Sequence, residues 1–325
     1  MTRPARVRQA VFDAAMAVDR GSALGSLSFE LLLRLARAGR DDGQALVRYE
    51  LAGRELLIPV THELPRYRRY SAGYGENVGR IAAAVHSKYP DATAVDIGAN
   101  VGDSAVLLTR EAPVPVLCVE GDPAFARLLR HNVRSLDGAV VVEAFVGAAA
   151  GEADVDRRAE GGTLRLDPGR GSTRVRFETL GSILAAHPTF ARPRLVKLDT
   201  DGLDVPILTA ERDLLATLRP AVFFEYAPDF YRDPDEAFRV FDLLAGAGYT
   251  RALAYLNQGD FLASADLGER RLLEDLHAFV TGHVDYGEPP PRYLDVCAFH
   301  ADDADVWEEA RRRELALQAR APTPA

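Results

Sequence analysis

Hydrophobic and polar residues follow one rhythm before about residue 90 and another after it. Residues 5–38 carry apolar side chains at helical spacing and end at Gly39, which predicts a pair of amphipathic helices. Residues 44–60 carry apolar and polar side chains on both sides of Gly53, a pattern typical of a β-hairpin. The aromatic and basic segment that follows ends in a helix predicted at residues 76–85.

From residue 94 onward, short apolar segments alternate with amphipathic ones. This alternation predicts an α/β fold, in which helices cover both faces of a mostly parallel sheet. Right-handed crossovers bring the carboxyl ends of the strands to one edge, where such sheets bind ligands. Strands are predicted at residues 93–98, 114–121, 139–147, 194–202, 220–228, 251–257, 259–265 and 293–300, and helices at 103–112, 123–136, 177–187, 204–218, 235–248 and 303–320.

One stretch, residues 151–176, interrupts the alternation because it is charged and rich in glycine. It is too polar to be core, and it forms either a hairpin beside a ligand pocket or a mobile loop. The chain therefore divides into an N-terminal part of helices, hairpin and connecting segment (1–90), a central sheet domain (91–300) and a C-terminal helix with its tail (301–325).

Composition narrows the classes of function. The chain has 325 residues, of which 47% are hydrophobic, so it can bury a full core. A formal net charge of −9 argues against nucleic-acid binding, which needs a basic face. Because no run of 18 apolar residues and no signal peptide is recognisable, we expect a cytoplasmic protein without a membrane partner. Cys118 and Cys297 lie in apolar runs and are expected to be buried free thiols.

The segment "AVDIGANVGDSA", residues 94–105, ends a buried strand in a glycine turn and then opens a helix. Glycines there let the backbone approach a ligand, and the helix start offers free N–H groups. Dinucleotide sites carry G-x-G-x-x-G, whereas this turn has Gly98 and Gly102 four residues apart, preceded by Asp96. An acid at the turn disfavours pyrophosphate and favours a cation. S-adenosylmethionine carries an ammonium, a sulfonium and a carboxylate, and it fits this pattern.

The second predicted strand ends in another acid, Glu120, 24 residues after Asp96. A carboxylate at that place can accept both hydroxyls of a ribose. Gly121 follows it directly. The loop after the third strand is placed to give apolar contact to an adenine through Phe145 and Val146. These positions, with Asp96, predict a nucleoside site across the first strands.

Five segments carry a further pattern, namely "VDIGANVGDSA", "CVEGDP", "TLGSIL", "VKLDTDGLDVPIL" and "PAVFFEY", with "HELPRYRRYSAGYGENVGRIA" upstream. Together they resemble the FkbM-type S-adenosylmethionine-dependent methyltransferases, a family of class I methyltransferases. The resemblance extends from about Glu63 to His300. It implies a Rossmann-like sheet of seven mostly parallel strands and methyl transfer, mostly to a hydroxyl oxygen of sugars or secondary metabolites. Many members show D-V-E-G-x-E where this chain has Asp199, Asp201 and Asp204.

An alcohol acceptor gains from a general base or a metal ion. Asp199, at the end of the fourth strand, either takes the acceptor's proton or fixes the following turn and helix. Glu225, at the end of the fifth strand, binds substrate or joins Asp199 around a divalent cation such as Mg²⁺. Asp201 and Asp204 are expected to cap the next helix, and Asp122 either assists Glu120 or caps its own helix.

The segment before the first motif carries His62, Tyr67, Tyr70, Tyr74 and Asn77. We interpret it as a lid over the cofactor, in which Tyr70 and Asn77 donate hydrogen bonds to the cofactor's carboxylate. His62 is expected to be a packing residue instead.

The sequence thus predicts an S-adenosylmethionine-dependent O-methyltransferase of a small hydroxylated acceptor. Two alternatives are a nicotinamide-dependent oxidoreductase and a non-catalytic binding module. The N-terminal helices are also a candidate homodimer contact. Asp199 and Glu225 are the predicted catalytic residues. The predicted cofactor-binding residues are Tyr70, Asn77, Asp96, Gly98, Asn100, Gly102, Asp103, Ser104, Glu120, Gly121, Phe145, Val146 and Asp199.

Overall fold

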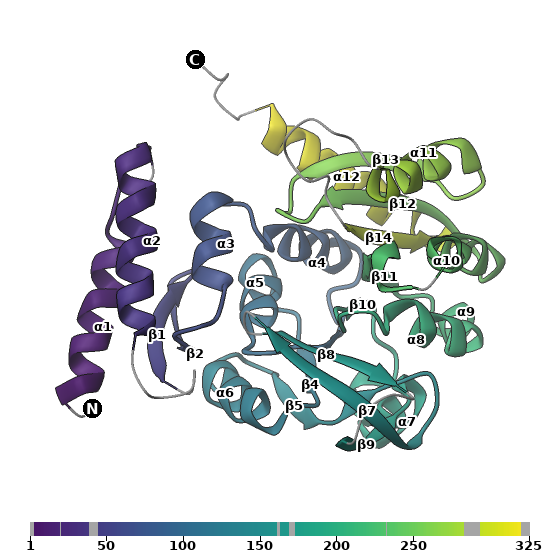
Figure 1. The fold of residues 1–325 in the computed structure, drawn as a ribbon. Helices are drawn as coiled ribbons and strands as arrows, with labels where there is room; N and C mark the ends of the chain where they lie inside the picture. Colours follow the sequence, from purple (N-terminus) through teal and green to yellow (C-terminus); the bar gives the residue numbers. More distant parts are fainter. Residues whose placement is uncertain are drawn as a thin grey trace.

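The computed structural model describes residues 3–19, 21–38, 45–160, 163–168, 173–231, 233–282 and 293–319. Within these residues the body of the protein is a central sheet with helices on both faces (Figure 1). The strands, in their order across the sheet, are β13 (Phe261–Asp266), β12 (Tyr249–Leu256), β14 (Leu294–His300), β11 (Ala221–Tyr226), β10 (Leu195–Leu198), β3 (Ala94–Ile97), β4 (Val116–Glu120) and β5 (Val140–Glu143).

Strands β11, β10, β3, β4 and β5 run parallel to their neighbours, whereas β14, β12 and β13 pair antiparallel. The predicted α/β class and the mostly parallel sheet are confirmed. The sheet has eight described strands instead of seven because β13 turns back on β12 as a hairpin and adds one more edge strand. The carboxyl ends of β3, β4, β10 and β11 share one edge, as the parallel register requires.

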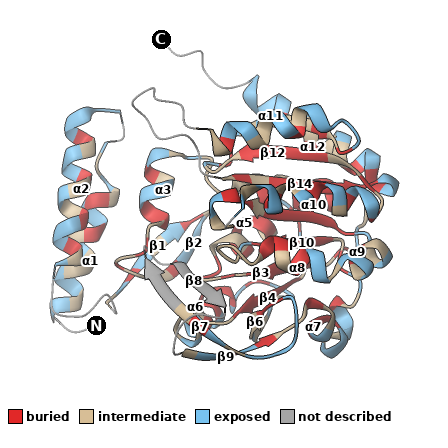
Figure 2. Cartoon of the chain, turned by 45° about the vertical axis from the view of Figure 1, so that its right-hand side comes forward, coloured by how far each residue is buried: buried red, intermediate tan, exposed pale blue. Residues whose placement is uncertain are grey.

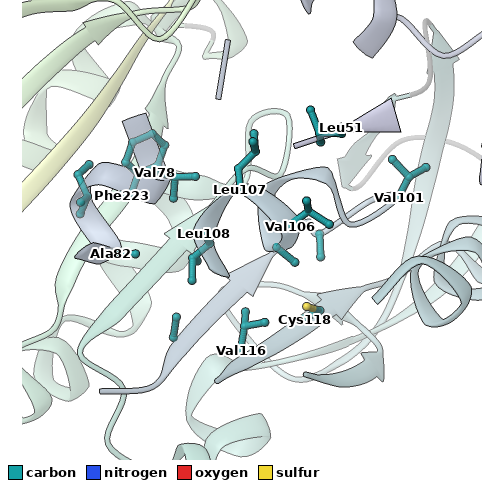
Figure 3. Packing of buried hydrophobic residues seen from close by; sticks show 14 of the residues in the cluster. Leu51, Val78, Ala82, Val101, Val106, Leu107, Leu108, Val116, Cys118 and Phe223 are labelled. Atoms are coloured by element: carbon teal, nitrogen blue, oxygen red, sulfur yellow. The ribbon is translucent and has the colours of Figure 1, made fainter. Parts of the chain in front are cut away.

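Two buried clusters fill the space on the two faces of the sheet. On one face, α4 (Glu76–Lys88), α5 (Asp103–Glu111) and the strands interlock, as Figure 3 shows for Val78, Leu107, Val116, Cys118 and Phe223. α12 (Ala304–Gln318) packs against α4 and β12 on that side. The other cluster includes residues of α7 (Leu180–Ala186), α8 (Asp204–Ala210), α9 (Arg212–Leu218), α10 (Pro234–Gly246) and α11 (Arg270–Thr281).

Alternation along the strands decides which side chains reach each face. Val95 and Ile97 of β3 belong to the second cluster, so Asp96 between them faces the side of α4 and α5. Lys197 of β10 lies opposite Asp96 in the parallel register and has the same orientation. Buried strand residues are drawn in red in Figure 2, and the outward faces of the helices are mostly exposed. Both cysteines are buried and unbonded.

The charged segment 151–176 is ordered as strands, so of the two interpretations the hairpin holds for its described residues. β7 (Gly151–Glu160) pairs antiparallel with β8 (Thr163–Pro168) and with β9 (Thr173–Glu178). The third predicted strand divides into β5 and β6 (Phe145–Val146), and β6 leaves the central sheet to pair with β9. Val155, Val175 and Phe177 form a small apolar cluster in contact with Phe145.

The N-terminal helices α1 (Arg3–Met16) and α2 (Ala23–Arg37) pack against each other at the side of the body (Figure 1). Their inner face joins the same buried cluster as α4 and α5, by way of the hairpin β1 (Leu46–Leu51) and β2 (Arg54–Pro59). α3 (Leu64–Tyr70) and α11 were not predicted, and the helix predicted at 204–218 is divided into α8 and α9. Among the described helices, none combines the length and the apolar character that crossing a membrane requires.

Candidate functional site

The turn after β3 brings two strand ends into close contact. Gly98 has φ +78°, and a Cβ there would overlap the carbonyl oxygen of Asp199 at the end of β10. Asn100 follows with φ +48°. Gly102 begins α5 with φ +88°, and a Cβ there would stand 2.9 Å from side chains of α6 (Pro123–Val133). Glycine is therefore required at both positions, by packing of the turn in each case.

Glu120 ends β4 and is held by the backbone beside it. Its Oε2 accepts the N–H of Asn100 at 2.9 Å, and its Oε1 accepts the N–H of Asp122 at 2.7 Å. Burial raises the pKa of Glu120 to about 7, although the two N–H donors act in the opposite direction. Each carboxylate oxygen has a second lone pair, so Glu120 can accept further hydrogen bonds from a ligand.

A narrow slot opens between the ends of β3, β4, β6 and β10. Its volume is about 60 Å³, which is below the roughly 300–1,000 Å³ of common ligand pockets. The Phe145 ring is one of its walls and lies so close to Gly121 that a Cβ there would overlap it. The slot is lined by Ile97, Gly98, Asn100, Val119, Glu120, Gly121, Phe125, Ala144, Phe145, Val146, Asp199, Thr200, Asp201 and Leu203.

A second space, which we term the wide pocket, adjoins the slot and has a volume of about 690 Å³. Gly98, Asn100, Asp199 and Asp201 line both spaces, so they form the junction. The wide pocket is further lined by His62, Glu63, Leu64, Arg66, Tyr67, Tyr74, Asp103, Ser104, Glu225, Phe230 and Tyr293. Beside it, a smaller cavity reaches Asn77, Lys197 and Asp295.

A buried lysine connects the strands beneath this junction. Lys197 Nζ lies 3.1 Å from Oδ1 of Asp96 and 3.1 Å from Oδ2 of Asp199. Burial alone would lower the pKa of Lys197, but the carboxylates of Asp199 and Asp96 outweigh it and raise that pKa. Asp96 is fully buried and also accepts the Ser104 hydroxyl at 2.6 Å, whereas the Asp199 side chain is 53% exposed.

Glu225, from β11, lines the wide pocket. Its Oε2 atom is buried and has no hydrogen bond among the described residues. Burial, followed by the charges of Asp199, Asp204, Asp201 and Asp295, raises the pKa of Glu225 far above its usual range.

About half of the chain is similar to a known protein family. Residues 96–251 match the family model of the methyltransferase FkbM domain. The chain contains an FkbM methyltransferase domain. The match begins within β3 and ends within β12, so it includes the slot, Asp199 and Glu225. The predicted resemblance to this family is confirmed, whereas the comparison with curated proteins gave no match.

Solved structures show distant likenesses. Methyltransferase FkbM from Methylobacillus flagellatus KT is 14% identical with a TM-score of 0.39, over 64% of this chain and 44% of that one. The chain thus spans less than half of that protein. TYW2 of M. jannaschii, solved with AdoMet, is 12% identical over 78% and 84% of the two chains, with a TM-score of 0.39. An O-methyltransferase from Bacillus cereus, solved with SAH, is 12% identical over 68% and 80%, with a TM-score of 0.36.

Within the FkbM domain, most predicted site residues meet at the slot and the wide pocket, but two do not reach either. Asp96 was expected to face a cationic ligand, whereas the structure places its carboxylate in contact with Lys197 and Ser104. Gly102 lies behind the turn, against α6. Asp103 and Ser104 line the wide pocket, and burial raises the pKa of Asp103.

The segment before the FkbM domain is placed differently from the prediction. Tyr70 is 57% exposed, and its hydroxyl donates to Glu30 of α2, so it does not line the site. Asn77 lines the smaller cavity and donates to Asp295 at 3.3 Å. Tyr67 and Tyr74 line the wide pocket, and their ring centroids are 5.0 Å apart.

Three aspartates and one histidine remain among the residues that the sequence singled out. Asp122 caps α6 as one prediction stated, accepting the N–H groups of Ala124 and Phe125. Asp204 does not cap α8. It instead accepts the N–H of Thr200 and the N–H of Glu225, which ties the ends of β10 and β11 together. Asp201 has φ +51° and lines the junction. His62 is buried beside Asn100.

Among the residues that the structure describes, no three His, Cys, Asp or Glu side chains are grouped so that they could hold Mg²⁺.

Lys197 and Asp295 were not predicted from the sequence as site residues. A lysine inside the apolar strand "RLVKLD" is a signal that could have identified the first. Burial raises the pKa of Asp295 to about 7.

Proposed function

We propose that this chain binds S-adenosylmethionine and methylates a hydroxyl oxygen of a small acceptor. The observation that carries the proposal is Glu120, a carboxylate held by two backbone N–H groups with its remaining lone pairs beside the slot. It suits the hydroxyls of a ribose. The apolar walls at Phe125, Phe145 and Val146 suit an adenine, for which the Phe145 ring must turn aside.

When bound, the cofactor supplies an electrophilic methyl group whose transfer releases a neutral thioether. The chain's own residues position the acceptor and handle its proton. Asp199 lies at the junction of the slot and the wide pocket and is half exposed, so its carboxylate can accept the proton of an acceptor hydroxyl. Lys197 holds this carboxylate from below. We assign Asp199 as the general base.

Titration calorimetry with S-adenosylhomocysteine and, separately, with NADH tests the proposal. We expect S-adenosylhomocysteine to bind and NADH not to bind, since the turn carries no pyrophosphate fingerprint. Binding of NADH in place of the nucleoside would support an oxidoreductase. If neither ligand bound, a non-catalytic binding module would be the remaining interpretation.

The acceptor class that we favour is a sugar or a small metabolite of secondary metabolism. We place the protein in the cytoplasm, because its two buried free thiols suit a reducing compartment.

We also propose that two copies pair through α2. Four leucines spaced by three, four and four residues (Leu24, Leu27, Leu31 and Leu35) are exposed along one side of this helix. An exposed apolar stripe of this kind marks a protein contact, and a standard interface buries about 800 Å² per partner. A second copy offers the same stripe, which makes the contact isologous. Light scattering should show a dimer that Leu27→Glu converts to a monomer, whereas a monomeric wild type would contradict this pairing.

A further inference from the structure

We propose that the wide pocket selects a hydroxylated acceptor that carries a protonated amine. This inference rests on the proposed function, since it takes the wide pocket to be the acceptor site. Three independent features support it, namely a buried carboxyl oxygen without a partner, an excess of negative charge and a group of aromatic rings.

The first feature is Glu225. Its Oε2 atom is buried without a hydrogen bond among the described residues, and its side chain lines the wide pocket. A buried polar atom left unpaired costs about 1–3 kcal/mol, so such atoms in folded proteins have partners or await them. Here the backbone N–H of Glu225 is already bound by Asp204, which fixes the strand end. A ligand N–H donor would complete the carboxyl group.

The second feature is the balance of charge. Carboxyl groups of Asp103, Asp199, Asp201 and Glu225 line the wide pocket, and Asp295 lies in the adjoining cavity. Nearby cations are already engaged, because Lys197 is paired with two aspartates, and Arg66 is paired with Glu30 and Glu63. Like charges gathered in a partly dry space repel one another. A ligand ammonium relieves that repulsion, whereas a neutral ligand does not and an anion increases it.

The third feature is the aromatic lining. The rings of Tyr67 and Tyr74 lie 5.0 Å apart with an angle of 34° between their planes, and Phe230 and Tyr293 line the same space. The faces of aromatic rings attract cations, and acids combined with rings are typical of sites for ammonium groups.

The nucleoside of the methyl donor does not account for these groups. It would lie in the slot, and the four residues Tyr67, Glu225, Phe230 and Tyr293 line the wide pocket but not the slot. Glu225 belongs to β11 and Tyr293 directly precedes β14, and both strands lie on the other side of β10 from β4, the strand of Glu120.

Three sugars of similar size and different charge test the inference. Glucosamine, glucose and glucuronate would be titrated at pH 7 into the full chain saturated with S-adenosylhomocysteine, with binding followed by saturation-transfer NMR. We expect glucosamine to bind about tenfold more tightly than glucose, which corresponds to one charge-assisted hydrogen bond, and glucuronate to bind most weakly. Equal binding of glucosamine and glucose, or tighter binding of glucuronate, would overturn the inference.

Variants locate the effect. Glu225→Gln should remove the preference for glucosamine while S-adenosylhomocysteine binds as before, and Glu143→Gln, at the exposed end of β5, should change neither. If Glu225→Gln does not fold, Tyr293→Leu provides a second test, because it should reduce the preference for glucosamine over glucose. An intact preference in both Glu225→Gln and Tyr293→Leu would contradict the inference. Failure of S-adenosylhomocysteine to bind the wild type would instead refute the proposed function, so the two failures are distinguishable.

Discussion

The slot and the wide pocket lie on either side of Asp199, yet the carboxyl groups of Glu120 and Glu225 differ in their hydrogen bonding. In the slot, Glu120 is oriented by the N–H groups of Asn100 and Asp122, so its geometry is fixed before any ligand arrives. In the wide pocket, the Oε2 atom of Glu225 is buried and has no partner among the described residues. Glu120 is preorganised, whereas the wide pocket has an unpaired carboxyl oxygen that a ligand can satisfy.

The difference corresponds to how each strand end is built. The slot edge belongs to β3 and β4, whose ends continue into tight turns that supply backbone donors. The pocket edge combines β10 and β11 with β14, which runs antiparallel and begins at that edge. Side chains therefore dominate the pocket, and changes there should alter the choice of acceptor without altering the nucleoside site.

The largest effect is expected from Lys197→Met, which should disrupt both regions at once. It leaves Asp96 buried without its counter-charge, and breaking a buried pair costs about 3–5 kcal/mol. Denaturant unfolding would measure the loss. Lys88 is the matched control, since it pairs with Asp303 and Asp305 but is partly exposed, and Lys88→Met should cost no more than about 1 kcal/mol. Equal losses in the two variants would show that burial of the pair is unimportant.

Next comes the junction, where Asp199→Asn should separate binding from reaction. The amide keeps the shape but cannot accept the acceptor's proton, so the rate of methyl transfer to glucosamine should fall by about 10²–10⁴. Affinity for S-adenosylhomocysteine should change only a few-fold. Asp213→Asn, on the exposed side of α9, serves as control. Undiminished turnover in Asp199→Asn would exclude this residue as the base.

The slot itself is tested by Glu120→Ala. Removing the carboxylate deletes the ribose acceptor and leaves two N–H groups without their partner, so S-adenosylhomocysteine should bind about 100-fold more weakly by calorimetry. Glu143→Ala at the end of neighbouring β5, where the acid pairs with Arg130 on the surface, should bind normally. An unaltered affinity in Glu120→Ala would place the nucleoside elsewhere.

The smallest expected effect is one of pH. Because burial raises the pKa of Glu120 to about 7 and ribose hydroxyls favour the ionised form, affinity for S-adenosylhomocysteine should rise about tenfold from pH 6 to pH 8. Glu120→Gln should flatten this profile. For the free protein the sign is reversed, since the folded state holds this proton more tightly than the unfolded chain, and the contribution to stability falls between pH 4.5 and 7.

Local sequence was sufficient for the parallel half of the site and insufficient for the rest. Gly98, Asn100 and Glu120 could be placed because a strand, its turn and the next helix are contiguous in the chain. Asp295 could not, because β14 enters the sheet between β11 and β12 from far along the sequence. The same holds for Asp96, whose partner Lys197 comes from a strand 101 residues later.

Tyr70 shows the complementary limit. Tyr67 and Tyr70 are three residues apart, which places them on neighbouring parts of one helix. Only the packing of α3 between the N-terminal helices and the sheet decides that the first lines the pocket while the second reaches Glu30. The helix α11, which was not predicted, likewise depends on how the C-terminal region folds back on the sheet. The strand β13 was predicted, but its place at the edge of the sheet depends on the same folding.

Helix α3 lies between the N-terminal helices and the wide pocket and contacts both. At its outer side Arg69 donates to the carbonyl oxygens of Val18 and Asp19 and stacks over Phe29, which fastens it to the α1–α2 connection. At its inner side the same short helix presents Tyr67 to the wide pocket. A displacement of α2, which carries the exposed leucines, would therefore reach the wall of the wide pocket through a single helix.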